Sequence, residues 1–473
     1  MTQDNTEKLR QLATEPVGRL LWRYSLPAVV GMLVISLYNV IDRIFIGQGV
    51  GPDAIAGLAV TFPVMNITTA LGVLVGAGSS ARVSILLGQG RIDEAERTLG
   101  NSLSLLLVFA TSYMALFYAF LDPVLRLFGA SDATLPYARD FISYLLPGLF
   151  MTNLAFSLNN VMRASGYPGR AMMTMVLGAV INAILAPIFI FVLHLGIKGA
   201  AIATDIAMAS CAAFVFAHFF RRGSTLRFRR GTFGLRWHTV AAIAAIGAAP
   251  SLVNFATSFI NIIINKTLLH YGGDMAIGAA GIFTTYAALL TTVVLGICQG
   301  MQPIVGYNYG AGRISRLRRT FWLAAAAATA ICAVGFAAAQ AAPRAIARAF
   351  TSDAYLLDVT ADALRTSMTL FVVVGFQIVA TTLFQSIGAA AKSVFLSLIR
   401  QVLFLIPLLV MLPKAMGLHG VWISFPASDL MATVVTTAMV LWQLRRFSAA
   451  VPAPHAPQGP ALTEVAAADS PER

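Results

Sequence analysis

The sequence is short of charge. Only 11% of its 473 residues are Asp, Glu, Lys or Arg, whereas soluble domains usually carry about a quarter. In contrast, 58% of the residues are hydrophobic and the mean hydropathy is +0.77. This composition excludes an ordinary soluble protein and indicates that lipid is the solvent for most of the chain. The net charge of +13 would suggest nucleic-acid binding in a soluble protein; here the basic residues lie in loops between apolar stretches, and no nucleic acid is expected.

Cysteine is also scarce. The three cysteines, Cys211, Cys298 and Cys332, stand far apart inside apolar stretches. This spacing supports neither a disulfide framework nor a metal cluster, and no cofactor is expected. The polar N-terminal stretch MTQDNTEKLRQLATEP lacks the apolar region of a cleaved signal peptide.

Catalytic motifs are missing as well. GQGR at 88–91 and GAGR at 310–313 are glycine-rich, but a phosphate-binding loop needs GxxxxGK followed by Ser or Thr, between a strand and a helix. The six histidines are scattered, and no Ser-His-Asp, HExxH or paired His/Cys arrangement is found. We therefore do not expect an enzyme.

Long apolar runs are what the sequence does contain. They are continuous rather than alternating, which predicts helices and excludes a membrane barrel. The fold class expected is an all-α polytopic membrane protein with twelve transmembrane helices in two six-helix bundles. The predicted spans are 20–46, 54–80, 98–121, 139–162, 170–193, 198–220, 240–268, 276–302, 320–341, 364–387, 394–413 and 419–444.

The arginines predict the orientation. Six lie between 221 and 236 and four between 313 and 319, and the loop near Arg91 is also basic. Loops on the other side carry fewer basic residues or combine them with acidic ones. The loop that contains Arg344 fits this pattern least. By the positive-inside rule, both termini are cytoplasmic and the protein lies in a bacterial inner membrane.

The chain repeats itself at an offset near 222 residues. GQGR at 88–91 matches GAGR at 310–313, GIKGA at 196–200 matches GLHGV at 417–421, and Pro27 matches Pro250. Six spans per half bring both halves into the membrane the same way up, with a pseudo-two-fold axis along the membrane normal. Such a pair of bundles suits a transporter. The predicted divisions are an N-lobe over 1–222, a basic linker over 223–237, a C-lobe over 238–445 and a disordered tail over 446–473.

Four stretches carry a family resemblance: SLPAVVGMLVISLYNVIDRIFIGQGVG, GAGSSARVSILLGQGRIDEAERTLGN, VINAILAPIFIF and QGMQPIVGYNYGAGR. With them the chain resembles the multidrug and toxic compound extrusion (MATE) family over about residues 16–445, in the bacterial branch with acids in the N-lobe. The resemblance implies a secondary transporter that exports cationic amphipathic compounds by alternating access, in exchange for protons or sodium.

The resemblance also implies an ion-coupling site in the N-lobe. It assigns the carboxylate to Asp42, hydrogen-bonding partners to Asn182 and Thr204, and the hinge to Pro27. The family's usual Leu-Asp-Pro in span 5 is Leu-Ala-Pro here, with Ala186 in place of the acid. A hard cation such as sodium needs several oxygen ligands, so this loss favours proton coupling.

Asp42 stands out on physical grounds too. An acid in a membrane span is costly and is a functional hypothesis by default. The equivalent position in the second half is Ile264, so the fold does not require an acid there. The structural alternative is a pair with Arg43, or a side chain reaching the headgroups.

Other intramembrane residues are weaker candidates. Asp205 adjoins Thr204 and is a candidate accessory acid, with helix packing against a base such as Arg163 as the alternative. Most polar, aromatic and methionine residues in spans simply pack against neighbours. The candidates for the substrate pathway are Tyr38, Asn39, Met151, Met172, Tyr286, Gln377 and Asp429.

The alternative function is a flippase for a lipid-linked or polysaccharide precursor with the same fold. It would need basic residues inside the cavity to bind pyrophosphate, whereas few cationic residues fall within the spans. A receptor or scaffold would not need an isolated buried acid. The partners expected are small cationic compounds, protons and the lipid bilayer, with the protein acting as a monomer.

Overall fold

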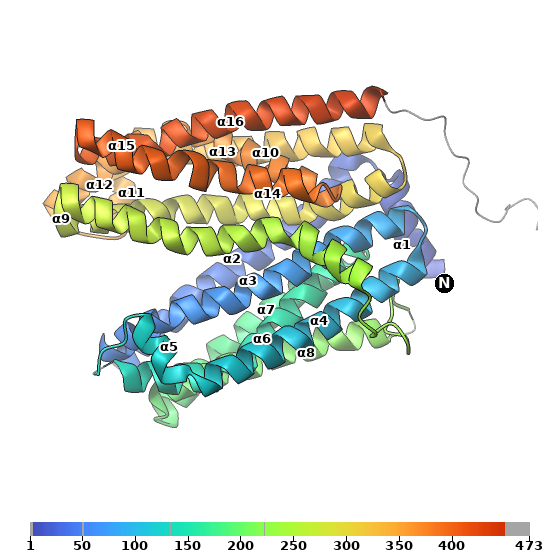
Figure 1. The fold of residues 1–473 in the computed structure, drawn as a ribbon, viewed down its shortest axis with the longest axis horizontal. Coiled ribbons are helices and arrows are strands. Elements are labelled where there is room, and N and C mark those ends of the chain that lie inside the picture. The colour runs from blue at the N-terminus through green and yellow to red at the C-terminus, as the bar shows by residue number, and fades with distance from the viewer. Residues whose placement is uncertain (1–2, 50–51, 133, 222, 450–473) are drawn as a thin grey trace, which may run out of the picture.

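The computed structural model describes residues 3–49, 52–132, 134–221 and 223–449, and these residues form helices and loops without a strand. The helices fall into two groups that meet at one end of the molecule and diverge toward the other (Figure 1). The predicted all-α fold in two bundles is confirmed. The tail predicted to be disordered lies almost wholly outside the described residues.

The first group, the N-lobe, contains six long helices and the short helix α5 at the far end. A further short helix, α1 (Gln3–Thr14), precedes them. The helices of the N-lobe are α2 (Val17–Gly49), α3 (Pro52–Gly88), α4 (Ile92–Ala119), α5 (Leu121–Leu127), α6 (Leu135–Ala164), α7 (Pro168–Pro187), its π-helical continuation η1 (Ile188–Val192), and α8 (Gly196–Phe220).

The second group, the C-lobe, contains the remaining helices. They are α9 (Trp237–Gly310), α10 (Ile314–Ala341), α11 (Pro343–Arg348), α12 (Ala354–Ser367), α13 (Val372–Ser386), α14 (Ala390–Leu398), its π-helical continuation η2 (Ile399–Leu405), α15 (Ile406–Met416) and α16 (Leu418–Ala449).

Twelve membrane crossings follow from these helices. Ten described helices are long and apolar enough to span a bilayer, and α12 with α13 forms a further span bent by 56°. The 74-residue α9 would be about 110 Å long as one straight helix, against a hydrocarbon core of about 30 Å. It breaks at Gly273, whose φ of 63° and ψ of −164° are not helical, and so it supplies two spans. We call them α9a (237–272) and α9b (274–310).

The observed spans are longer than the predicted ones. The helix predicted over 54–80 runs to Gly88, and the span predicted from residue 364 already begins at Ala354. Helices continue beyond the apolar core because their polar ends keep forming backbone hydrogen bonds in the headgroup region. Apolar runs therefore locate a span but do not mark where its helix stops.

Contacts between α3 and α9b reveal the internal symmetry. A residue on a two-fold axis touches its own equivalent in the other half. The Ser80 hydroxyl lies 3.5 Å from Oε1 of Gln302, its equivalent 222 residues later. A Cβ on Gly306 would lie 2.7 Å from the Ser84 Cβ, at the same offset. The pseudo-two-fold axis therefore passes between α3 and α9b, close to Ser80 and Ser84, which lie one turn apart on α3.

The two lobes touch through backbone at one end. A Cβ on Gly78 would lie 2.0 Å from the Ile243 carbonyl oxygen, and one on Gly247 would lie 1.8 Å from that of Leu74. Gly88 lies equally close to the Tyr307 carbonyl oxygen. Only glycine permits such an approach, as at close helix crossings in membranes generally. We call this contact between α3 and α9 the seam.

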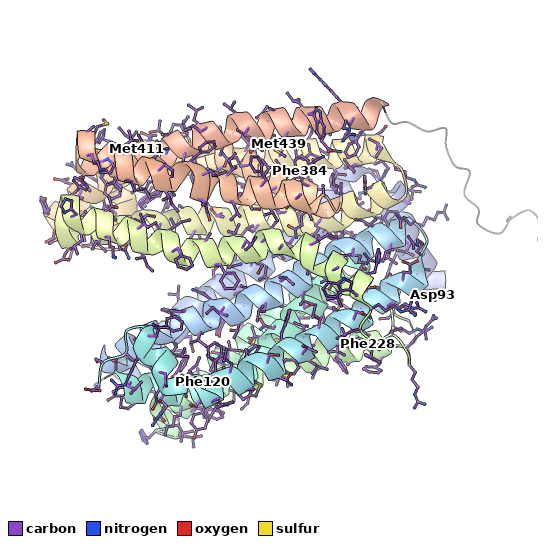
Figure 2. The ribbon with its side chains drawn as sticks, viewed as in Figure 1. Asp93, Phe120, Phe228, Phe384, Met411 and Met439 are labelled. Atoms are coloured by element: carbon purple, nitrogen blue, oxygen red, sulfur yellow. The ribbon has the colours of Figure 1, made fainter. Side chains whose placement is uncertain are left out.

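The seam lies at the end of the molecule that carries the α3–α4 turn, the linker and the α9–α10 turn; we call this the basic end. Figure 2 shows Asp93 and Phe228 there, with Phe120 and Met411 at the opposite, far end, where the lobes have diverged. Two segments reinforce the basic end. The linker binds the start of α4, where Asn101 donates to the Thr232 and Gly234 carbonyls at 3.0 and 3.1 Å. The end of α1 and the residue after it bind the C-lobe, where Arg316 donates to the carbonyls of Leu12 and Glu15 at 3.3 and 2.7 Å.

Candidate functional site

Asp42 lies on α2, seven residues before the helix ends. It is half-buried, and its Oδ1 atom is shielded from solvent. If α2 is centred on the bilayer, Asp42 lies about 14 Å from the helix midpoint, near one edge of the hydrocarbon core. On this placement the acid lies away from the membrane centre, and its half-burial keeps it out of bulk solvent.

A group of polar side chains from three helices surrounds this position. Tyr38 lies one turn before Asp42 on α2 and is close enough to interact with both the Asp42 carboxylate and the Thr204 hydroxyl. Nδ2 of Asn182, which is 1% exposed, donates to Oγ1 of Thr204 at 3.0 Å. The structure thus brings together Tyr38, Asp42, Asn182 and Thr204 from α2, α7 and α8. A partly buried chain of this kind can hold a proton on a carboxylate and respond when the proton leaves.

The equivalent place in the C-lobe is apolar. Ile264 is 6% exposed and packs with Ile260, Leu268 and Trp422. The same backbone position therefore carries a polar network in one lobe and hydrocarbon in the other. Helix packing at this position of the C-lobe is therefore achieved without an acid.

The position of the missing acid is fully buried. Ala186 is 0% exposed and lies in the apolar cluster that includes Ile142, Leu146 and Ile190. No group of three or more His, Cys, Asp or Glu side chains that could hold a metal ion occurs in the described part of the chain. The site around Asp42 therefore offers one carboxylate and neutral oxygens.

Asp205 is placed apart from this network. Its carboxylate packs onto Gly148 of α6, where a Cβ would lie 1.6 Å from Oδ1. The alternative pairing with Arg163 is not observed: Arg163 donates instead to Asn160 and Gln299. Asp205 thus occupies a separate position between α6 and α8, in the space left by Gly148.

Three predicted pathway residues of the C-lobe are engaged within that lobe. Nε of Arg400 donates to Oδ1 of Asp429 at 2.5 Å, and the Asp429 side chain is 3% exposed. Nε2 of Gln377 donates to the Asp429 carbonyl at 2.7 Å. The Tyr286 hydroxyl donates to the Gly335 carbonyl at 2.8 Å. A substrate role for Asp429 would require its ion pair to open.

The remaining candidates lie in the N-lobe. Met151 and Met172 are half-buried, and the side chain of Asn39 falls outside the described part of the structure. Pro27 lies inside α2 between Ser25 and Val29, which pack against Gly300 and Gly296 of the C-lobe. The predicted hinge is therefore at the inter-lobe contact rather than beside Asp42.

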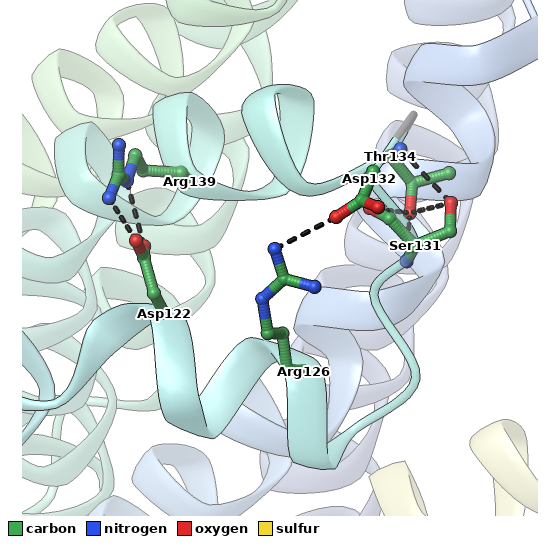
Figure 3. A network of polar contacts seen from close by, with 6 residues as sticks. All are labelled: Asp122, Arg126, Ser131, Asp132, Thr134 and Arg139. Atoms are coloured by element: carbon green, nitrogen blue, oxygen red, sulfur yellow. Dashed lines mark hydrogen bonds and ion pairs between the residues drawn. The ribbon is translucent and has the colours of Figure 1, made fainter.

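Several charged side chains at the far end form ion pairs. In Figure 3, Arg139 reaches across to the Asp122 carboxylate and Arg126 lies 2.8 Å from Asp132. Arg344, which fitted the loop pattern least, forms an ion pair with Asp358 at 2.7 Å. Pairing explains why arginine there coexists with acid, whereas several arginines at the basic end bind backbone carbonyls instead.

From the sequence, Arg163 is only an alternative packing partner for Asp205 and not a candidate site residue. It is 2% exposed at the basic end of α6 and contacts the C-lobe through Gln299. The signal in the sequence is a cation one residue beyond the span predicted over 139–162. Arginines at span ends usually extend to the headgroups, so this position does not stand out in the sequence.

The MatE family model matches this chain twice, over residues 27–188 and 250–411, together more than half of its length. The chain belongs to the MatE family. The two matches begin at Pro27 and Pro250, the pair of prolines that the internal repeat relates.

Relatives and solved structures agree with this assignment. An FAD transporter of Shewanella oneidensis is 27% identical over 89% of this chain and 93% of its own. The multidrug export protein MepA of Staphylococcus aureus is 25% identical over 93% of this chain and 96% of its own. The outward-facing structure of a multidrug resistance MATE family transporter aligns with a TM-score of 0.87 and 25% identity, over 93% of this chain and 98% of that one. This chain is therefore a multi-pass membrane transporter with the twelve-helix, two-lobe MATE fold, and not an enzyme.

Proposed function

We propose that this MATE transporter exports cationic amphipathic compounds in exchange for protons, with Asp42 as the coupling carboxylate. The observation that carries the proposal is the polar network of Tyr38, Asp42, Asn182 and Thr204 in a lobe whose twin is apolar at the same place. Ala186 in the apolar cluster favours protons over sodium, because a sodium site needs more oxygen ligands than this network supplies.

Competition for one carboxylate gives the coupling. The ionised form of Asp42 attracts a cationic compound, and the protonated form does not. A proton arriving from outside releases the compound, and loss of that proton on the inside restores the charge. Each cycle then exchanges one for the other, provided that the lobes alternate in their access.

The lobe arrangement supports an orientation for this cycle. With the basic end in the cytoplasm, as the positive-inside rule requires, the seam closes the cytoplasmic side and the lobes diverge toward the outside. Both termini then lie in the cytoplasm, and the protein acts in the inner membrane of a bacterium. In this orientation Asp42 lies near the outer side, where protons enter.

Reconstitution into liposomes tests the proposal. Efflux of a cationic dye should follow an imposed proton gradient, and a sodium gradient alone should have no effect. Asp42→Asn should reduce proton-driven efflux at least tenfold, because an amide carries no titratable proton.

Asp122→Asn is the matched control, since it makes the same change in an acid of the same lobe that lies at the far end. Proton-driven efflux that survives in Asp42→Asn would remove this carboxylate from the mechanism. Efflux driven by sodium alone would overturn the choice of ion.

Export of a flavin dinucleotide is the second candidate function, favoured by the likeness to the FAD transporter. The same liposomes loaded with FAD distinguish the two. Proton-driven loss of FAD without movement of the cationic dye would replace the first candidate by the second.

A further inference from the structure

Arg163 is a buried cation without an acid. It is 2% exposed, and no described carboxylate forms an ion pair with it. Its Nη1 donates to Oδ1 of Asn160 at 3.2 Å and to Oε1 of Gln299. Its Nη2 is buried and has no hydrogen-bond partner among the described residues. Burying a charge is costly unless a partner compensates it, so a guanidinium in this state is a functional candidate.

Further unsatisfied polar atoms line the neighbouring helices. Oγ of Ser157 on α6, Oγ of Ser79 on α3 and Nε2 of Gln302 on α9b are buried and find no hydrogen-bond partner in the part of the chain that the structure describes. The close approach of Gly76 to Ser157 and Asn160 joins α3 to α6 here, and the contact of Ser80 with Gln302 joins α3 to α9b. Gln299 and Gln302 lie within one turn of each other.

These groups share one chemistry. Arg163, Ser79, Ser157 and Gln302 each present an N–H or O–H donor, and no described acid pairs with any of them. A guanidinium with a free edge matches the two oxygens of a carboxylate or phosphate, and nearby hydroxyl and amide donors add to that match. The arrangement favours a ligand rich in acceptor oxygens.

The two lobes share this group. Arg163, Ser79 and Ser157 belong to the N-lobe, whereas Gln299 and Gln302 belong to the C-lobe. Separation of the lobes at the seam would remove Gln299 from Nη1, so that one N–H of Nη1 becomes available beside Nη2, while Asn160 stays bound to Nη1. The site is therefore closed in this structure, and separation of the lobes at the basic end would open it.

We propose that Arg163 and the surrounding donors form an oxyanion-binding site, loaded from the cytoplasmic side, for exported compounds that carry a phosphate or carboxylate. This inference rests on the proposed function in one respect, the alternating access of the lobes. It does not depend on the coupling ion, because binding at Arg163 needs no gradient.

Equilibrium binding to the purified, full-length protein tests the site with two fluorescent probes, riboflavin and riboflavin 5′-phosphate, which differ by one phosphate. The phosphorylated probe should bind at least tenfold more tightly. Arg163→Gln should abolish this difference between the two probes, and Arg163→Lys should retain part of it. Arg139→Gln, at the far end, removes the same charge and is the control.

A second pair of variants keeps the test decisive if Arg163→Gln does not fold. Gln299→Leu removes the inter-lobe acceptor of Arg163 and should strengthen binding of the phosphorylated probe severalfold. A Ser80→Cys/Gln302→Cys cross-link, in a chain whose native cysteines are replaced by alanine, should prevent that binding until it is reduced.

Equal binding of the two probes by the wild type, or undiminished phosphate preference in Arg163→Gln, overturns the inference. Binding that persists in the cross-linked protein also overturns it. Loss of proton coupling in the liposome assay would leave these results as they stand, so failures of the two proposals are distinguishable.

Discussion

At the scale of the residue, the chain uses its few intramembrane charges in different ways. Asp42 joins a polar network across three helices, and Asp429 is held by Arg400 within one lobe. Arg163 bridges the lobes through a neutral amide. An ion pair between two buried groups offsets the cost of desolvation, whereas a charge with only neutral partners remains ready to bind or release an ion.

Ala186→Asp is informative because this position carries an acid in the usual family pattern. Here the side chain would enter an apolar cluster at a position that is 0% exposed. We expect the melting temperature of the purified protein to fall by several degrees, since a buried carboxyl without partners is costly. Sodium should not restore it.

Ala186→Asn, of nearly the same size but uncharged, separates volume from charge in that measurement. A gain of stability on adding sodium to Ala186→Asp, absent with potassium, would instead show that Asp42 and the new carboxylate form a cation site.

At the scale of the element, glycine decides how closely helices cross. The seam depends on Gly78 and Gly247 meeting carbonyl groups of the opposite lobe. The π-helical segment η1 continues α7 directly after Pro187 of span 5. Its counterpart η2 joins α14 to α15 just before Pro407 of span 11. Such segments widen a helix locally and are common at functional sites.

Gly78→Ala should force the lobes apart at the basic end, because its Cβ would lie 2.0 Å from the Ile243 carbonyl oxygen. We expect the population with the seam open to increase. Electron–electron resonance distances between spin labels at the exposed positions 91 and 319 should lengthen.

Gly18→Ala is the control, since that helical glycine has nothing within 4 Å of an added Cβ. An unchanged distance distribution in Gly78→Ala would mean that the contact is accommodated by local shifts, and that this glycine does not set the separation of the lobes.

At the scale of the whole molecule, the pseudo-two-fold axis relates two lobes of similar fold and different chemistry. Their contacts are concentrated at the basic end, where α1 and the linker add further links. Two rigid bundles joined at such a seam can rock between two arrangements.

Locking the seam should stop transport. In the cysteine-replaced chain, a Ser80→Cys/Gln302→Cys cross-link joins residues whose side chains lie within 3.5 Å. Oxidised protein in liposomes should lose at least nine tenths of its dye efflux, and a reductant should restore it. Each single-cysteine variant is a control. Full efflux by the oxidised double variant would exclude opening of the seam from the cycle.

The sequence alone determined that the chain lies in lipid, that it is helical, how many spans it has and that it repeats after 222 residues. Each of these properties is written in the local composition and the periodicity of the chain. The sequence also singled out Asp42, since an acid stands out where its twin is Ile264. Only the tertiary structure decided which polar groups meet. Arg163 and Gln299 are 136 residues apart in the sequence, and Arg400 on η2 contacts Asp429 on the separate helix α16. Such pairs depend on the angle and distance at which helices cross. Glycine contacts between distant segments set that angle and distance, and no local sequence pattern encodes them.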